Sequence, residues 1–167
     1  MNKLILLVSH VGANSSELCR AMSFNKKIHW VNQEIIYDYP IVTNLPTHKY
    51  NDYSGIYINE ILYNYQITHK GIYKTCQFIY LINKNFNNLD YYIFRLRRIY
   101  EMARETKGAI FLTWDDIMNG KGVKLIEDVY DINLSEIKKN FNKNKMAEQA
   151  YELCLYRINK LNFLERV

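Results

Sequence analysis

The first eighteen residues restrict the fold more than any other part of the chain. An apolar run at residues 4–8 leads into a short polar segment with one glycine and two adjacent serines, and apolar residues with helical spacing begin at Leu18. A buried strand, a tight turn and a helix start are typical of the first unit of an α/β fold. The N–H groups and dipole of such a helix point at the turn, which predicts an anion site at residues 9–16. The Gly-Lys-Ser/Thr ending of a Walker A motif is absent.

Composition indicates a globular protein. The 167 residues are enough for one domain with a full core, so we expect a single domain over residues 1–167. No apolar run reaches the roughly 20 residues that a membrane span needs. Three cysteines without paired spacing predict reduced thiols and a cytoplasmic location. A net charge of +5 suits a small anionic ligand or weakly favours nucleic acid, and it does not decide between the two.

Two further apolar runs resemble the first. Residues 78–82 and 109–113 are continuous apolar segments, which are typical of strands buried on both faces. Residues 28–32 predict a shorter strand. Residues 33–52 hold both prolines and show no clear period, so they predict a loop with brief extended pieces.

Helical spacing follows the strands. It predicts helices over residues 56–65, from Leu89 to Lys107, over residues 123–130, and from Ser135 through a C-terminal helical segment (135–167) that residues 142–145 can interrupt. Strands that alternate with helices predict a three-layer α/β/α fold with a mostly parallel sheet and right-handed crossovers.

Three polar segments follow the three strongest strands, at residues 9–16, 83–88 and 114–119. Ligands of open parallel sheets bind beyond the carboxyl ends of the strands. We therefore expect these segments to converge on one site.

Three segments, in this order, resemble the signatures of the P-loop sulfotransferases, which use 3′-phosphoadenosine 5′-phosphosulfate as donor. Residues 12–16 are similar to the loop that holds the 5′-phosphosulfate. Residues 78–85 are similar to the strand and exit that hold the 3′-phosphate. Residues 110–117 are similar to a later strand that ends in a Tyr-Glu-Asp-Leu-like tetrapeptide. The resemblance implies a P-loop NTPase/sulfotransferase-like fold and transfer of a sulfuryl group to an unidentified hydroxyl acceptor.

The resemblance also implies a donor site. Its residues would be Ser9, His10, Gly12, Ala13, Asn14, Ser15, Ser16, Asn83, Lys84 and Arg95. The chain departs from the family in two places. The basic residue before the glycine is missing, with His10 as the one substitute, and Asn83-Lys84-Asn85 stands where the family has Arg-x-Pro. These departures predict weaker donor binding, a different anion or a loss of catalysis.

Histidines supply the candidate catalytic groups. Family members often place a catalytic His or Glu between the first loop and the second strand, which makes His48 a candidate general base and His69 a second. His10 beside the predicted cradle is the other candidate. Each histidine also has a simpler interpretation: solvent exposure for His48 and His69, and a structural role for His10.

Two charged segments allow more than one interpretation. Arg95 and Arg98 share a helix face and could hold a phosphate or a nucleic-acid backbone, whereas Arg97 fits a solvated face with Glu101 as its partner. The Asp115-Asp116 pair could hold Mg²⁺ or cap the following helix, and we expect capping. No spacing of Cys and His predicts a metal site.

Four functions remain as hypotheses. The first is a sulfotransferase-like enzyme that binds an anionic nucleotide-like molecule, and the second is a non-catalytic binding protein that keeps the fold and the anion site. A nucleotide kinase or NTPase relative is opposed by the absent P-loop lysine, and a nucleic-acid-binding module comes last. The sequence does not indicate an oligomeric state.

Overall fold

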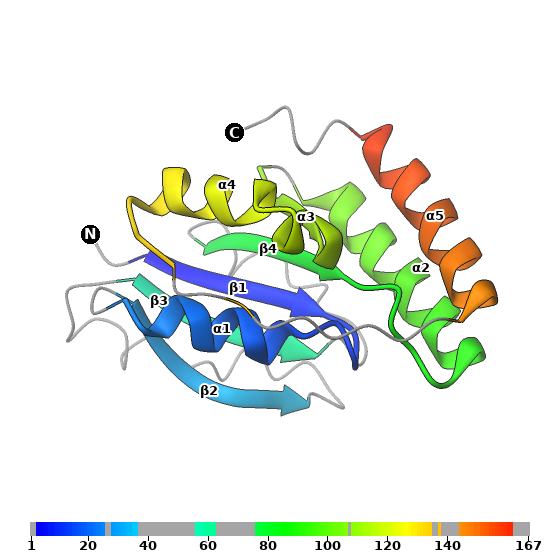
Figure 1. Cartoon of the computed structure of the whole chain (residues 1–167), viewed down its shortest axis with the longest axis horizontal. Helices are drawn as coiled ribbons and strands as arrows, with labels where there is room; N and C mark the ends of the chain where they lie inside the picture. Colours follow the sequence, from blue (N-terminus) through cyan, green and yellow to red (C-terminus); the bar gives the residue numbers. More distant parts are fainter. Residues whose placement is uncertain are drawn as a thin grey trace.

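The computed structural model describes residues 3–25, 28–36, 56–62, 76–106, 108–134, 137 and 144–161. The described strands form one parallel sheet of five strands in the order β2-β3-β1-β4-β5 (Figure 1). The strands are β1 (Lys3–Ser9), β2 (Ile28–Ile36), β3 (Ile56–Leu62), β4 (Cys76–Ile82) and β5 (Ile110–Thr113). The helices are α1 (Ser15–Ser23), α2 (Leu89–Glu105), α3 (Trp114–Met118), α4 (Lys121–Tyr130) and α5 (Lys145–Asn159).

The three strongest predicted strands are neighbours in the sheet. β1 pairs with β4, and β4 pairs with β5, both in parallel. This confirms the predicted parallel arrangement of the three apolar runs. Their continuous apolar sequence has a simple cause, because the middle of the sheet is covered on both faces.

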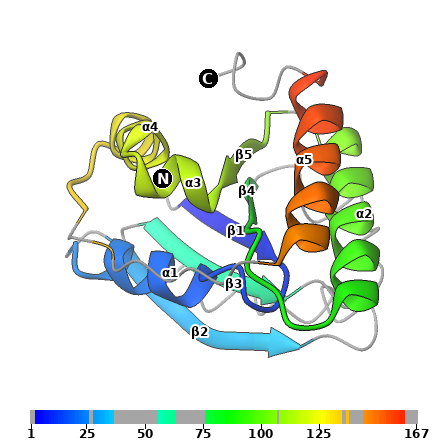
Figure 2. The same ribbon diagram turned by 45° about the vertical axis from the view of Figure 1, so that its right-hand side comes forward.

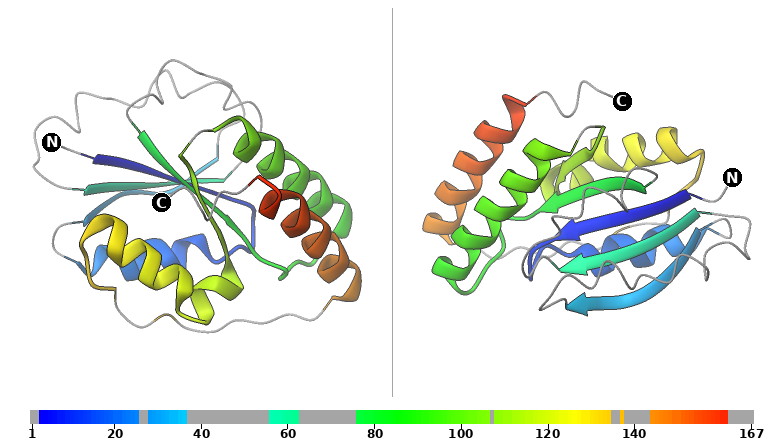
Figure 3. Two further views of the ribbon diagram at one scale, coloured as in Figure 1. Left: turned by 90° about the horizontal axis from the view of Figure 1, so that it is seen from above. Right: turned by 180° about the vertical axis from the view of Figure 1, so that it is seen from behind.

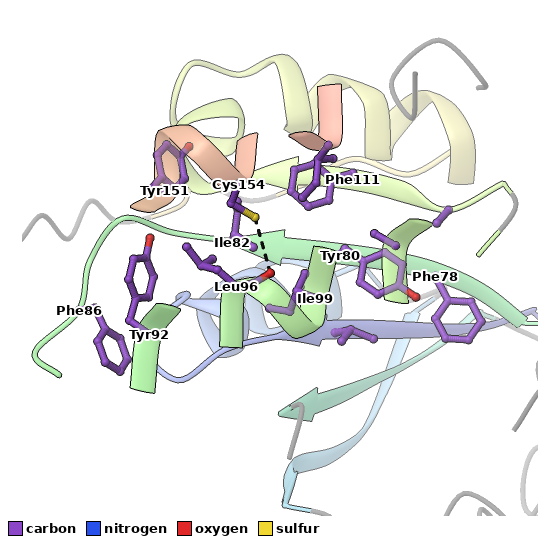
Figure 4. Close-up of a cluster of buried hydrophobic side chains, with 14 of the residues drawn as sticks. Phe78, Tyr80, Ile82, Phe86, Tyr92, Leu96, Ile99, Phe111, Tyr151 and Cys154 are labelled. Atoms are coloured by element: carbon purple, nitrogen blue, oxygen red, sulfur yellow. Dashed lines mark hydrogen bonds between the residues drawn. The ribbon is translucent and has the colours of Figure 1, made fainter. Parts of the chain in front are cut away.

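Helices cover the two faces of the sheet, so the architecture has three layers (Figures 2 and 3). On one face, Phe78, Tyr80 and Ile82 of β4 pack with residues of α2 and α5, and Figure 4 shows this cluster. On the other face, Ile79 and Leu81 pack with residues of α1, α3 and α4. Successive residues of β4 point to opposite faces, which places five adjacent apolar side chains in two cores.

The prediction of a helix over residues 56–65 is wrong, because residues 56–62 form β3. β3 lies between β2 and β1. A short apolar run fits both the helical and the strand period, and the isoleucines at positions 56, 58 and 61 are β-branched, which favours a strand. The interior position of β3 in the sheet then decides between them.

The second strand is longer than predicted. β2 extends to Ile36, into the segment predicted as a loop. Its pairing with β3 shifts between Trp30 and Asn32 and again between Asn32 and Ile35. Such irregularities break the two-residue period of a strand, which explains why the sequence pattern predicted only the first part of β2.

The helix boundaries differ from the predictions at specific caps. α2 begins after Asn88, whose side chain accepts a hydrogen bond from the N–H of Tyr91, and it ends at Glu105, ahead of the predicted Lys107. α5 begins at Lys145 after the capping residue Asn144, inside the predicted interruption at 142–145. The predicted start at Ser135 lies outside the described residues. The helix predicted over 123–130 begins two residues earlier, at Lys121.

One predicted loop segment is helical. Residues 114–118 form α3, and its N-cap is Thr113 rather than either aspartate. The Thr113 hydroxyl accepts a hydrogen bond from the N–H of Asp116 at 3.0 Å, and the Asp116 carboxylate accepts from the N–H of Thr113 at 2.9 Å. Asp116 therefore takes part in capping as the third residue of a capping box. In the part of the chain that the structure describes, no helix is long and apolar enough to cross a membrane.

Candidate functional site

The candidate site lies at the carboxyl ends of β1 and β4, which are neighbours in the sheet. The helices that follow these strands pack on opposite faces, since α1 contributes Leu18 and Met22 to one core and α2 contributes Tyr92 and Leu96 to the other. Ligands of α/β sheets commonly bind beyond the strand ends where successive helices leave on opposite faces, and we call this region the strand-end crevice. The first two predicted site segments begin at this point.

The first loop makes a tight turn between β1 and α1. The N–H of Ala13 donates to the carbonyl of His10 at 3.1 Å. Gly12 (φ 82°) and Asn14 (φ 63°) both have left-handed backbone conformations, and the carbonyl of Asn14 accepts the first helical hydrogen bonds of α1. Left-handed residues that alternate with ordinary ones are typical of anion-binding nests, and in this loop the N–H of Ala13 is already engaged with His10.

His10 is buried and held by both ring nitrogens. Its Nε2 accepts a hydrogen bond from the N–H of Asn83 at 2.9 Å, so the ring proton lies on Nδ1, which donates to the carbonyl of Val11 at 2.7 Å. Burial lowers the pKa of His10 to about 4, against the opposing effect of its two backbone hydrogen bonds, and the charge of Arg95 lowers it further. The ring is therefore neutral at physiological pH. This geometry favours the structural alternative for His10 over a role as a catalytic base or as a cation.

Asn83 joins the second loop (residues 83–88, after β4) to the first. Its side-chain Nδ2 donates to the carbonyl of Gly12 at 3.2 Å, and its Oδ1 accepts from the N–H of Asn85 at 3.3 Å. Its own carbonyl accepts a hydrogen bond from the hydroxyl of Tyr92 at 2.8 Å. Asn83 thus supports the shape of the loop pair, and its amide groups are engaged within the protein.

Aromatic rings enclose this junction. The rings of Phe86 and Tyr92 meet the His10 ring edge-on, with centroids at 6.1 and 5.2 Å, and stack on one another at 5.1 Å. Burial raises the pKa of the Tyr92 hydroxyl, which keeps it a donor. Sequence reasoning missed Tyr92 and Phe86, because aromatic residues at these positions look like ordinary core residues and their partner lies far away in the chain.

The third segment joins the site through Lys84. Its Nζ lies 3.5 Å from the carboxylate of Asp115, the second residue of α3. The hydroxyl of Tyr151 on α5 donates to the same carboxylate oxygen at 3.3 Å. Because Asn83 contacts the first loop and Lys84 contacts α3, the three predicted segments converge as expected.

Arg95 supplies a buried positive charge close to the loops. Its side chain is 4 % exposed, and the guanidinium lies over the ring of Tyr91, 4.4 Å from the centroid. The ring of Tyr91 in turn stacks on Phe86, with centroids 5.7 Å apart, so Arg95 lies beside the loop that follows β4. Its charge is also among the influences that lower the pKa of His10. A guanidinium in a poorly solvated position attracts anions more strongly than one in water does.

Two buried polar atoms border the first loop. Ser9 Oγ and Asn14 Nδ2 are buried and form no hydrogen bond within the described part of the chain. Burial without a partner is unfavourable by about 1–3 kcal/mol per group. Ser15 is buried as well, Ala13 is fully buried, and Ser16 is half-buried. Polar atoms at this position can be satisfied by a bound anion or by water.

The other candidate residues are not placed. His48 and His69 lie outside the described residues, so the choice of a general base stays a prediction. Among the described residues, no group of three or more His, Cys, Asp or Glu side chains could hold a metal ion.

No protein-family model matches the chain, and a search of curated proteins found no matching relative.

Proposed function

We propose that the crevice at the carboxyl ends of β1 and β4 binds an anionic, nucleotide-like small molecule through a phosphate or sulfate group. The observation that carries the proposal is the backbone of the first loop, with Gly12 and Asn14 left-handed immediately before α1. Its position at the point where α1 and α2 diverge is where α/β sheets bind ligands. N–H groups and a helix N-terminus at such a loop favour an anion.

Charge near the loop supports an anion over a neutral ligand. The buried guanidinium of Arg95 lies over Tyr91, which stacks on Phe86 of the second loop, and Lys84 lies at the junction of this loop with α3. The buried Ser9 hydroxyl and the Asn14 amide offer further hydrogen bonds.

The sulfotransferase resemblance implies a donor with a 5′-phosphosulfate and a 3′-phosphate. The same residues fit the phosphosulfate better than the 3′-phosphate. The first loop suits a phosphosulfate or phosphate. The exit of β4 does not supply the arginine that the resemblance requires for a 3′-phosphate, and Asn83 is engaged with Gly12 and Asn85. We therefore place anion binding first and catalysis second.

The test is a calorimetric titration with adenosine 3′,5′-bisphosphate, with ATP–Mg²⁺ and adenosine as controls. We expect the bisphosphate to bind and adenosine to bind much more weakly. Gly12→Val should abolish binding while the far-UV circular dichroism stays unchanged, because a β-branched side chain is strained at this backbone angle. Equal binding of adenosine and the bisphosphate would contradict the proposal.

Sulfuryl transfer is the second candidate. It is favoured by one observation: the three segments that resemble the sulfotransferase signatures include or follow the neighbouring parallel strands β1, β4 and β5. A single sulfotransferase-like domain over the whole chain is part of the same proposal. It is tested by release of adenosine 3′,5′-bisphosphate from 3′-phosphoadenosine 5′-phosphosulfate in the presence of a panel of hydroxyl acceptors. Turnover that is lost in His48→Gln would support it, and binding without turnover across the panel would leave the binding function alone.

A further inference from the structure

A groove of about 350 Å³ runs between α2 and α5, separate from the crevice at the strand ends. The two helices lie side by side and run in the same direction (Figure 2). The floor includes Leu96 and Cys154, which are buried, and the thiol of Cys154 donates a weak hydrogen bond to the carbonyl of Leu96 at 3.7 Å (Figure 4). This volume lies within the range of small-molecule sites, about 300–1,000 Å³.

One end of the groove is mostly apolar, and Gln149 is the polar side chain among the residues that line it. Leu89 and Met146 lie seven and eight residues before the Leu96–Cys154 contact, and Ile93 and Leu153 lie between. With a rise of about 1.5 Å per residue, this apolar half extends for roughly 10 Å along the helices. Three of its side chains are exposed to solvent: Ile93 at 41 %, Leu153 at 51 % and Met146 at 61 %.

The other end of the groove carries two positive charges. Arg97 and Arg157 follow the Leu96–Cys154 contact by one and three residues and line the same groove. The glutamate that the sequence suggested for Arg97 is engaged elsewhere, since Glu101 pairs with Arg98 at 2.9 Å. Neither Arg97 nor Arg157 forms an ion pair with any side chain that the structure describes.

An apolar trough that ends in two guanidinium groups is complementary to one type of ligand. We propose that this groove binds a small amphipathic carboxylate or sulfate, with its apolar body along Ile93 and Leu153 and its anionic head at Arg97 and Arg157. Two guanidinium groups can hold an oxyanion through charge-assisted hydrogen bonds. Covering the exposed apolar side chains supplies the rest of the affinity. The proposal does not depend on the function proposed for the strand-end crevice.

The probe is decanoate, titrated into the full chain by calorimetry, with decanamide as the neutral counterpart. We expect decanoate to bind and decanamide to bind at least about tenfold more weakly, which is the effect of losing one charge-assisted contact. Methyl spectra of ¹³C-labelled Met should show a shift at Met146, assigned with Met146→Leu.

Two variants and a matched control locate the site. The double variant Arg97→Gln/Arg157→Gln should weaken decanoate binding about tenfold or more, and Leu153→Glu should abolish it. The control is Arg104→Gln/Lys124→Gln, which also removes two positive charges, from exposed positions of α2 and α4 outside the groove, and should leave binding unchanged. All of these positions are exposed, so the variants should fold like the parent chain.

Three outcomes would overturn the proposal. Decanamide that binds as tightly as decanoate would show an apolar site without anion selectivity. Equal losses in Arg97→Gln/Arg157→Gln and in Arg104→Gln/Lys124→Gln would show a general charge effect. Failure to bind decanoate together with binding to phosphatidylglycerol vesicles would assign the surface to a membrane instead.

Discussion

The backbone N–H of Asn83 donates a hydrogen bond to the Nε2 atom of His10 across 73 residues of sequence, at a distance of 2.9 Å. This bond joins the ends of the two central strands at the point where the binding crevice of an α/β sheet forms. It also fixes the ring in its neutral form, because a protonated Nε2 could not accept the bond. The residue that substitutes for a cation in the sulfotransferase resemblance is therefore a neutral part of the loop framework.

The buried His10 predicts a loss of stability in mild acid. Its pKa is lowered in the folded state, to about 4, whereas the unfolded chain has the ordinary value near 6.5. As the pH falls, the unfolded state therefore binds the proton first. The contribution of neutral His10 to the free energy of unfolding is complete above pH 6.5 and is lost as the pH falls toward 4. The shift corresponds to about 3 kcal/mol. Urea unfolding from pH 7.5 to 4 should show this decline in the free energy of unfolding. In His10→Gln, which cannot titrate, the slope of this free energy against pH should correspond to about one proton fewer.

Gly12 should be more sensitive to substitution than another glycine with the same backbone geometry. Gly12 and Gly108 have φ values of 82° and 72°, so alanine is strained at both. A Cβ at Gly12 would lie 3.1 Å from the carbonyl oxygen of Asn85, whereas a Cβ at Gly108 meets no described atom within 4 Å. Both variants should lose about 1–2 kcal/mol from the left-handed backbone.

Thermal unfolding and titration with adenosine 3′,5′-bisphosphate separate the two effects. Gly12→Ala should lose additional stability and anion affinity, and Gly108→Ala should keep its affinity. Equal behaviour of the two variants would mean that the approach of the second loop to Gly12 has no energetic consequence.

Removal of the Asn83 side chain should loosen both loops. Asn83→Ala leaves the carbonyl of Gly12 and the N–H of Asn85 without the hydrogen bonds they now form, with an expected loss of about 1–3 kcal/mol. Asn85→Ala is the matched control, because the hydrogen bond of Asn85 with Asn83 uses the backbone. Chemical denaturation measures both, and a loss in the control as large as that in Asn83→Ala would remove the special role of Asn83.

Asp115 should compete with a bound anion for Lys84. The two side chains are 3.5 Å apart and partly exposed, so the pair contributes at most about 1 kcal/mol. Asp115→Asn releases the ammonium group and should tighten binding of adenosine 3′,5′-bisphosphate up to about fivefold. Asp128→Asn, an equal charge change at an exposed position of α4, is the control, and Lys84→Gln should cancel the gain. An equal gain in both aspartate variants would indicate the overall charge as the cause.

The central sheet could be predicted because its evidence is local. The runs at residues 78–82 and 109–113 are apolar at every position except Thr113, and a strand covered on both faces requires this. In the segment at residues 56–62, Asn59 and Glu60 interrupt the apolar run. Its identity as a strand depends on pairing with β1 and β2, which the local pattern does not contain.

The convergence of the three polar segments could be predicted from the sequence, but the contacts that each residue makes could not. Polar segments after apolar strands predict where a crevice lies, and the contacts of Asn83 with the first loop and of Lys84 with α3 agree with this. The sequence does not tell whether a histidine faces a ligand or a backbone amide. For His10 that depends on Asn83 and Tyr92, which reach it only through the tertiary fold.

The position of β1 in the middle of the sheet has a consequence for how the chain folds. Lys3 pairs with Ile56 and Leu4 pairs with Cys76, so both neighbours of β1 lie more than 50 residues away in sequence. Neither β1 edge can be covered until a long stretch of chain has closed, and the entropy of that closure opposes the first contacts. We expect folding to be slow for a protein of this size, with β1 exposed to pairing with other molecules until β4 reaches it.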